Sequence, residues 1–263
     1  MKKKDQLSYF RHEWAKLKAD LKTFDKKGKQ EALHRFRVQV KKLRAFLVLA
    51  DSGENVHKLE KQLKPVRKIF KAGGVIRNAY MTLELSKEYQ QRPSAFMRGQ
   101  RRLMKESAAL FRSASAKHLA RVRQTRRRLK KAVPRFSNVH ISMYYQQQLE
   151  EIALCLKPRR SEASLHDCRK QIKMLIYNYP LVKPVLSLAF NEVYLEQVQT
   201  AIGDWHDKQV AIELFSSEEV GAAPVAESLK KEQTQLKTKI RGLVKDFYNR
   251  ATTVVDLPLN QID

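Results

Sequence analysis

Apolar residues recur every three or four positions along almost the whole chain. No segment shows the strict alternation of apolar and polar residues that is typical of a β-strand. The spacing predicts helices at residues 5–24, 29–50, 55–71, 75–90, 94–113, 116–133, 140–157, 162–180, 184–202, 205–216 and 225–251. Glycine and proline mark most of the predicted breaks, among them Gly28, Gly53, Gly73, Gly74, Pro134, Pro180, Gly203 and Gly221. The pattern therefore predicts an all-α helical bundle with short connections.

The charge of the chain indicates that this bundle has an anionic partner. Among 263 residues, 53 are Lys or Arg and 27 are Asp or Glu, which gives a net charge of +26. Such an excess repels itself in a compact fold, so we expect nucleic acid, an anionic membrane surface or a phosphate polymer as partner. No apolar run is long enough to span a membrane, and no signal peptide is apparent. We therefore expect a cytoplasmic protein in which Cys155 and Cys168 are reduced, partly buried thiols.

The most basic part of the chain lies at its centre, between Arg98 and Arg135. From Lys117 to Arg135 there are nine basic residues and no acidic one. An apolar stripe persists through this segment, formed by Leu119, Val122, Leu129 and Val133. The segment is therefore interpreted as a packed helix with a basic outer face that ends at Pro134.

Two sequence blocks occur twice, in the same order. The block LHRFRVQVKKLR begins at Leu33, and the related block LHDCRKQIKMLIY begins at Leu165. A second pair consists of GVIRN, which begins at Gly74, and GDWHD, which begins at Gly203. The interval from the first copy to the second is nearly the same for both pairs. Two matched pairs at nearly one interval predict an internal duplication, with a first repeat at about 5–135 and a second at about 138–252.

The basic residues of each block form a stripe on one side of a helix. At about 100° per residue, four of them fall within a sector of about 80°: His34, Arg37, Lys41 and Arg44. The second block repeats the pattern with His166, Arg169, Lys173 and Tyr177. Each stripe borders the apolar sector, so we expect it to line a cleft between helices and to bind an anion such as phosphate. Taken singly, the histidines are equally well interpreted as half-buried residues bonded to a neighbour.

The repeated H-x-x-R-x-x-x-K pattern resembles the CHAD family, the conserved histidine α-helical domain, over roughly residues 5–250. The resemblance implies one domain across residues 1–263, built of two four-helix bundles related by a pseudo-two-fold axis, with a basic groove or pore between them. It implies binding of inorganic polyphosphate without catalysis or cofactor, and association with polyphosphate granules. Its polyphosphate-binding residues would be His34, Arg37, Lys41, Lys42, Arg44, His166, Arg169, Lys173 and Tyr177.

Two positions depart from the family pattern. Ile176 stands where an arginine would mirror Arg44, so the second half is expected to hold phosphate less firmly. Asn78 replaces an aspartate, which is expected to loosen a cap or an arginine partner. Outside the stripes, further basic residues are candidates for the same surface: Arg77, Arg102, Lys105, Arg126 and His206.

Nucleic-acid binding is the main alternative. The basic segments lack interleaved aromatic residues for base stacking, and no helix-turn-helix, zinc-finger or RNA-recognition signature is present. The charge alone predicts weak binding to nucleic acid. A membrane-surface role is less favoured, because the helix at 117–133 has neither Trp nor Phe on its apolar face.

Catalytic and metal-binding signatures are absent from the sequence, so no enzyme activity is predicted. There is no Walker-type loop, HExxH pair, nucleophile elbow or acidic cluster for Mg²⁺. The nearest approach to a metal site is Asp204, His206 and Asp207, within one helical turn. The two aspartates are interpreted as helix N-terminal caps or arginine partners, and no metal site is expected.

Overall fold

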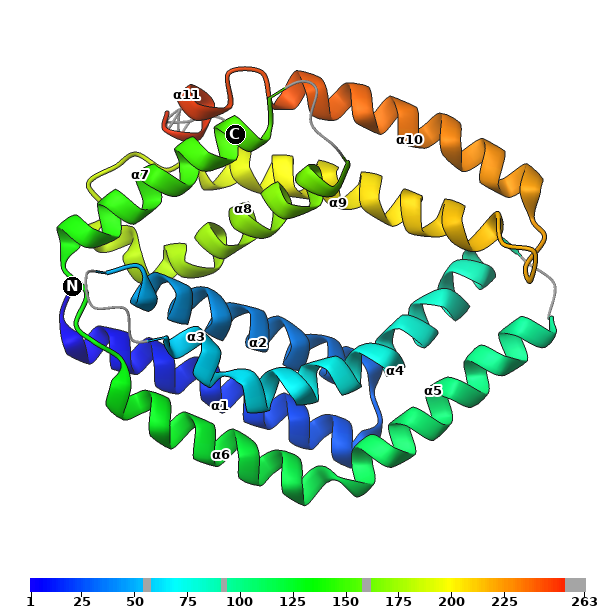
Figure 1. The fold of residues 1–263 in the computed structure, drawn as a ribbon, viewed down its shortest axis with the longest axis horizontal. Coiled ribbons are helices and arrows are strands. Elements are labelled where there is room, and N and C mark those ends of the chain that lie inside the picture. The colour runs from blue at the N-terminus through cyan, green and yellow to red at the C-terminus, as the bar shows by residue number, and fades with distance from the viewer. Residues whose placement is uncertain (54–57, 91–93, 158–161, 254–263) are drawn as a thin grey trace, which may run out of the picture. The chain divides into compact units, whose positions relative to one another are not determined.

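The computed structural model describes residues 1–53, 58–90, 94–157 and 162–253 of the chain. This described part is all-helical and contains no β-strand, so the predicted fold class is confirmed (Figure 1). The elements are α1 (Lys3–Lys27), α2 (Gln30–Asp51), α3 (Leu59–Gln62), α4 (Lys64–Glu88), α5 (Ala95–Ser113), α6 (Ser115–Ala132), α7 (Asn138–Cys155), α8 (Glu162–Val182), the 3₁₀ turn η1 (Lys183–Val185), α9 (Glu192–Phe215), α10 (Ala223–Leu243) and α11 (Phe247–Ala251).

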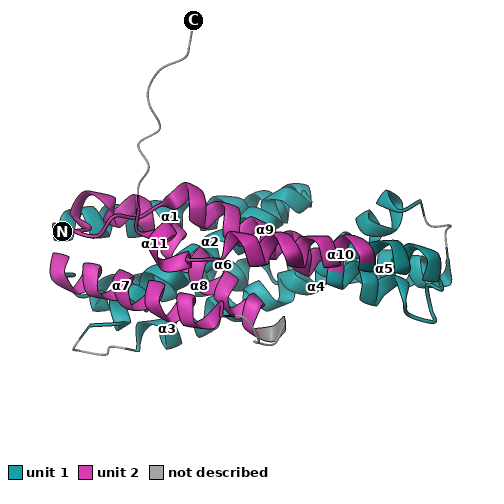
Figure 2. Cartoon of the chain, turned by 90° about the horizontal axis from the view of Figure 1, so that it is seen from above, with its two compact units in different colours: residues 1–137, 209–230 teal, residues 138–208, 231–263 magenta. Residues whose placement is uncertain are grey.

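The chain divides into two compact units (Figure 2). Unit 1 comprises Met1–Ser137 and Gln209–Lys230, and unit 2 comprises Asn138–Lys208 and Lys231–Asp263. The first boundary falls in the segment after Pro134, where the sequence placed the end of the first repeat. The later segment 209–230 groups with unit 1, although it follows the second pair of sequence blocks.

Unit 1 is a bundle in which α1, α2, α4 and α6 contact one another in a ring, so that α2 and α6 occupy opposite corners. Its core contains an aromatic cluster in which Phe46 lies 5.9 Å from Phe10 and 5.5 Å from Phe136, between ring centroids. Trp14, only 1% exposed, extends the cluster along α1. Burying each such side chain stabilises the fold by about 1.5–3 kcal/mol, and the ring pairs add about 0.5–1.5 kcal/mol.

Unit 2 is organised around α7, α8 and the first part of α9. The buried Tyr145 ring lies 5.3 Å from Phe190, and its hydroxyl donates to the backbone oxygen of Leu175 at 2.8 Å. Cys155 and Cys168 form a disulfide that joins the end of α7 to α8. The prediction of two separate reduced thiols was therefore wrong. The two cysteines lie on consecutive helices. Their Cα atoms are 6.2 Å apart, a separation that a disulfide can bridge.

Two of the helix breaks predicted at glycines were wrong. Helix α4 runs without interruption through Gly73 and Gly74, and α9 runs through Gly203. The consequence for the aspartates is direct, because Asp204 and Asp207 lie inside α9 and therefore do not cap its N-terminus. Gly74 and Gly203 each pack against an arginine side chain, and Gly73 packs against Leu33 and Phe111, so packing stabilises the helices through these positions.

Smaller corrections concern helix ends. Pro180 lies inside α8, which continues to Val182. The predicted helix at 225–251 is divided after Leu243, because Asp246 adopts a left-handed conformation with φ of 55° before α11 begins. The predicted helix at 55–71 is divided between α3 and α4, and its residues 55–57 lie outside the described part of the chain.

Candidate functional site

In unit 1, the arginine of the first sequence block packs flat against α4. The Nη1 atom of Arg37 donates to the backbone oxygen of Phe70 at 2.6 Å. Its guanidinium carbon lies 4.0 Å from the centroid of the Phe70 ring. One turn further along α4 is Gly74, where a Cβ atom would lie only 2.8 Å from Nη1. The missing side chain at Gly74 is therefore what allows the guanidinium to reach this position.

In unit 2, the arginine of the second block packs against α9 in the same way. The Nε atom of Arg169 donates to the backbone oxygen of Gln199 at 3.1 Å. A Cβ atom at Gly203, again four residues after the accepting carbonyl, would lie 2.7 Å from Nη2 and 3.0 Å from Nε. Gly74 and Gly203, which the sequence suggested as helix breaks, are thus contact surfaces for an arginine inside unbroken helices.

The arginine contacts involve two residues that sequence reasoning missed, Phe70 and Gln199. The interval between them along the chain is the same as that between Gly74 and Gly203. Phe70 and Gln199 are different residue types. They can play the same part because each bonds to the arginine through its backbone oxygen and not its side chain. The only sequence signal was positional, namely the place four residues before each glycine of the second block pair.

Positive charges are crowded around Arg37. Burial lowers the pKa of Arg37, and the nearby charge of Arg77 on α4 lowers it further. The guanidinium of Arg77 itself lies over the Tyr80 ring, 5.0 Å from the centroid. In the described part of the chain, no carboxylate oxygen lies within 4.0 Å of either guanidinium. Unit 1 therefore holds two neighbouring cations at this site without an acidic partner.

In unit 2, Lys173 lies one turn beyond Arg169 and is positioned by a polar relay. Its Nζ atom donates to the Oε1 atom of Gln199 at 3.1 Å. The Gln199 amide nitrogen in turn donates to Glu196 at 2.6 Å and to Thr200 at 2.9 Å, which leaves its oxygen facing the lysine. Burial lowers the pKa of Lys173, and the charge of Arg169 acts in the same direction. A bound anion would oppose both effects, because a nearby negative charge favours the charged form of the lysine.

An aromatic side chain and two histidines complete the site in unit 2. Lys173 Nζ lies 5.6 Å from the centroid of the Tyr177 ring. The rings of His166 and His206 lie 4.6 Å apart between centroids, so the structure joins one residue from each of the two sequence blocks. Burial lowers the pKa of His166, and Lys170 and His206 lower it further. The structure therefore places His206 directly beside His166 of the second stripe.

The remaining stripe residues of α2 have different surroundings. His34 and Lys41 are exposed, and Lys42 is half-buried. Arg44 is 46% exposed, and its Nε atom lies 2.9 Å from an oxygen of Glu60 that Arg67 also contacts, at 3.0 Å. At the matching place in unit 2, Ile176 is buried with 8% exposure. The basic stripe of α8 is therefore shorter by one cation than that of α2.

Three of the additional candidates lie on α5 and α6 of unit 1. Arg102 and Lys105 are exposed on α5, and Arg126 is exposed on α6, where it lines a groove shared with α1. Because α6 lies at the opposite corner of the unit 1 bundle from α2, Arg126 is remote from Arg37. The structure therefore joins Arg77 and His206 to the two stripes but does not join Arg126 to the stripe of α2.

Within the described residues, no group of three or more His, Cys, Asp or Glu side chains is placed to hold a metal ion. None of the helices searched there has the length and apolar character needed to cross a membrane.

Comparisons with known proteins agree with the fold and with the sequence blocks. A search of curated proteins found no match. Among solved structures, the chain is similar to the crystal structure of the CHAD domain from the plant Ricinus communis. The TM-score is 0.59 at 18% sequence identity, and the match covers 89% of this chain and 88% of the other. The family model for the CHAD domain matches residues 8–216, which include both histidine blocks and both glycine blocks. On this evidence the chain belongs to the CHAD domain family.

Proposed function

We propose that the protein binds inorganic polyphosphate without changing it chemically, through the His–Arg–Lys stripe of α2 in unit 1 and that of α8 in unit 2. The observation that carries the proposal is the repeated arginine contact. In each unit a guanidinium is fixed by a backbone oxygen against a helical glycine, beside at least one further cation. Fixed, crowded and partly desolvated cations are arranged as a phosphate-binding surface is, since a bound anion relieves their repulsion.

A phosphate polymer suits these sites better than a single small anion. Both stripes present several cations along about two turns of helix, so each can contact several consecutive phosphates. A flexible polyanion that occupies both units gains affinity from the second contact without any new chemistry, because that contact becomes intramolecular. The net charge of +26 adds a general attraction for any polyanion.

We further propose that the repeats at about 5–135 and 138–252 derive from an internal duplication, as the sequence blocks predict. The support is that the same set of contacts recurs at nearly constant intervals. The interval from Arg37 to Arg169 is close to the interval between their acceptors, Phe70 and Gln199. The shortened stripe of α8 would then be a divergence of the second repeat, in which Ile176 replaced a cation and joined the core.

The proposal places the protein in the cytoplasm, in association with polyphosphate granules.

Direct titration tests the proposed function. Labelled long-chain polyphosphate should bind the protein, and the logarithm of the affinity should fall linearly with the logarithm of salt concentration. Four phosphate contacts predict a loss of about 100-fold between 50 mM and 200 mM salt. Gel analysis after prolonged incubation should show a polymer of unchanged length. Shortening of the polymer, or an affinity that does not respond to salt, would argue against non-catalytic binding by cationic stripes.

A further inference from the structure

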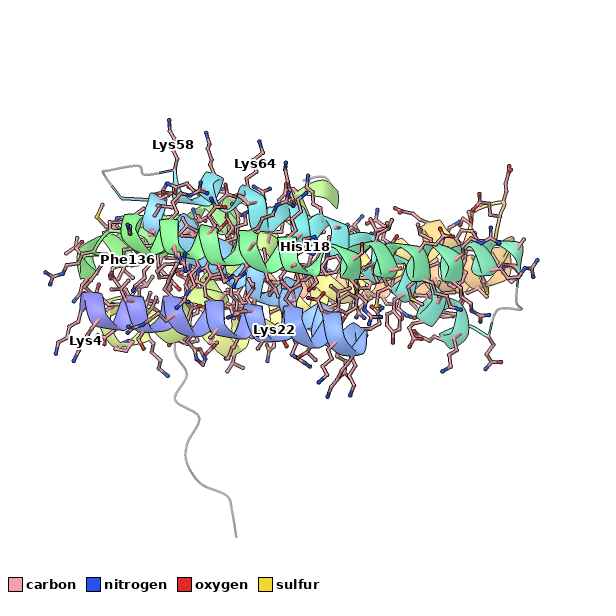
Figure 3. All side chains as sticks on the ribbon, turned by 90° about the horizontal axis from the view of Figure 1, so that it is seen from below. Lys4, Lys22, Lys58, Lys64, His118 and Phe136 are labelled. Carbon is pink, nitrogen blue, oxygen red and sulfur yellow. A yellow bond between two sulfur atoms is a disulfide. The ribbon has the colours of Figure 1, made fainter. Side chains whose placement is uncertain are left out.

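Helix α6 carries a second concentration of positive charge in unit 1, far from the stripe of α2. In the ring of helices α1, α2, α4 and α6, helix α6 stands diagonally opposite α2 and contacts α1, α3 and α4. Figure 3 shows lysines on both sides of α6, with Lys58 and Lys64 on the side of α3 and α4, and Lys22 on the side of α1. The arginines of α6 are therefore separate from the site around Arg37.

The side toward α3 and α4 forms a groove of about 650 Å³. Six of its eight lining residues are cationic: Lys58, Lys61, Lys64 and Lys68 from one wall, and Arg121 and Arg128 from the other. No acidic residue is among those that line it in the described part of the chain. Arg128 crosses from α6 toward α3, and its Nη2 atom donates to the backbone oxygen of Gln62 at 2.8 Å. At least one cation of the groove is thus held in place before any ligand binds.

The arrangement of charge indicates what kind of anion fits. Arg121 and Arg128 are seven residues apart on α6, which is about 10 Å along a helix, and four lysines line the opposite wall. An anion in this groove is surrounded by cations on two sides over several phosphates. No aromatic side chain lines the groove, so nothing there would stack on a base. These features favour a slender phosphate chain without bases over single-stranded nucleic acid.

The groove on the other side of α6, toward α1, has more apolar lining residues than the groove toward α3 and α4. It measures about 430 Å³, and the exposed side chains of Ala15 and Ala19 provide apolar surface between its cations. A hydrated phosphate chain gains less there, because part of the wall offers it no donor. The comparison singles out the groove toward α3 and α4.

We propose that the groove between α6 and the α3–α4 segment is a second, independent binding site for inorganic polyphosphate. This inference rests on the proposed function, since it assigns the same polymer to another face of unit 1. Its lysines are exposed, so salt screens them more than the half-buried cations beside Arg37 and Arg169. The groove therefore binds more weakly than the stripes and adds a second step to a titration.

Calorimetric titration with medium-chain polyphosphate tests the second site. The groove variant combines Lys61→Gln, Lys64→Gln and Lys68→Gln, and its control removes three charges from exposed positions on α1, with Lys4→Gln, Lys16→Gln and Lys26→Gln. We expect two binding steps for the unaltered protein and for the control. The groove variant should lose the weaker step and keep the tighter one, with an unchanged melting temperature in the absence of ligand.

Several outcomes would overturn the second site. Equal losses in the groove variant and the control would show general attraction by net charge, and no loss in either would show that the groove does not bind. If the groove variant lost RNA binding but kept both polyphosphate steps, the groove would be a nucleic-acid site. In each of these cases the stripes would still bind polyphosphate. If the unaltered protein bound no polyphosphate at all, the proposed function itself would fail.

Discussion

Replacing Lys41 and Lys173 together with alanine is expected to weaken polyphosphate binding by about 100-fold at physiological salt. The two lysines occupy matching places on α2 and α8, one turn beyond the fixed arginines. A hydrogen bond to a charged group contributes about 1.5–3 kcal/mol, and two such losses amount to at least about two powers of ten in affinity. The measurement is the dissociation constant of labelled polyphosphate for each variant.

The lysines are better probes than the arginines they accompany. Arg37 and Arg169 bond to backbone oxygens of the neighbouring helix, so their removal also alters packing. The control is Lys16→Ala with Lys26→Ala, which removes the same charge from exposed positions on α1. If the control lost as much affinity as the stripe variant, binding would depend on net charge and not on the stripes. A large fall in melting temperature for the stripe variant would show that the two lysines are structural.

Substituting alanine for Gly74 or Gly203 is expected to weaken polyphosphate binding by about tenfold each, without removing any charge. The new Cβ atom would lie 2.8 Å from Nη1 of Arg37 or 2.7 Å from Nη2 of Arg169, so the guanidinium must move. Displacement breaks its bond to the carbonyl and withdraws a fixed donor from the site, a loss of about 1.4 kcal/mol of binding energy. The free energy of unfolding should change by less than about 1 kcal/mol. The higher helix propensity of alanine, about 1 kcal/mol over glycine, offsets most of the stability lost with the arginine hydrogen bond.

Gly99 and Gly242 provide matched controls for these substitutions. Both lie inside helices, α5 and α10, and a Cβ atom at either position would meet nothing within 4 Å. Gly99→Ala and Gly242→Ala should therefore raise the melting temperature slightly and leave binding intact. If Gly203→Ala bound polyphosphate as tightly as Gly242→Ala, the position of the Arg169 guanidinium would be irrelevant to binding. Parallel titrations and thermal melts of the four variants decide the matter.

The glycines also show where reasoning from sequence failed and why. The helical spacing of apolar residues predicted the fold class, because helix packing depends on that period alone. Glycine weakens an isolated helix, so Gly74 and Gly203 were interpreted as breaks. Tertiary packing outweighs that preference here, since each glycine accommodates an arginine from another helix. The sequence signal for this packing was the nearly constant interval from the arginine to the glycine in the two halves. Helix propensity is a local property and takes no account of such an interval.

Other parts of the site depended on contacts between segments distant in sequence. The stripe of α2 was predicted, but the engagement of Arg44 by Glu60 and Arg67 required knowledge of how α3 and α4 fold back on α2. The approach of His206 to His166 was predicted only as a shared surface, and the structure gives the ring contact. The side-chain role of Gln199 could not be predicted, because its first-half counterpart Phe70 has no amide to form the same relay.

The most direct test of polyphosphate binding is a competition titration at about 150 mM salt, where exposed charges are screened beyond about 8 Å. Labelled long-chain polyphosphate bound to the protein is challenged with excess single-stranded RNA, duplex DNA and heparin, at equal concentrations of anionic groups. We predict that polyphosphate remains bound against all three, because each stripe holds an arginine fixed by a backbone oxygen beside further cations. Displacement by RNA or DNA at equal phosphate concentration would contradict the account and identify a general polyanion or nucleic-acid binder.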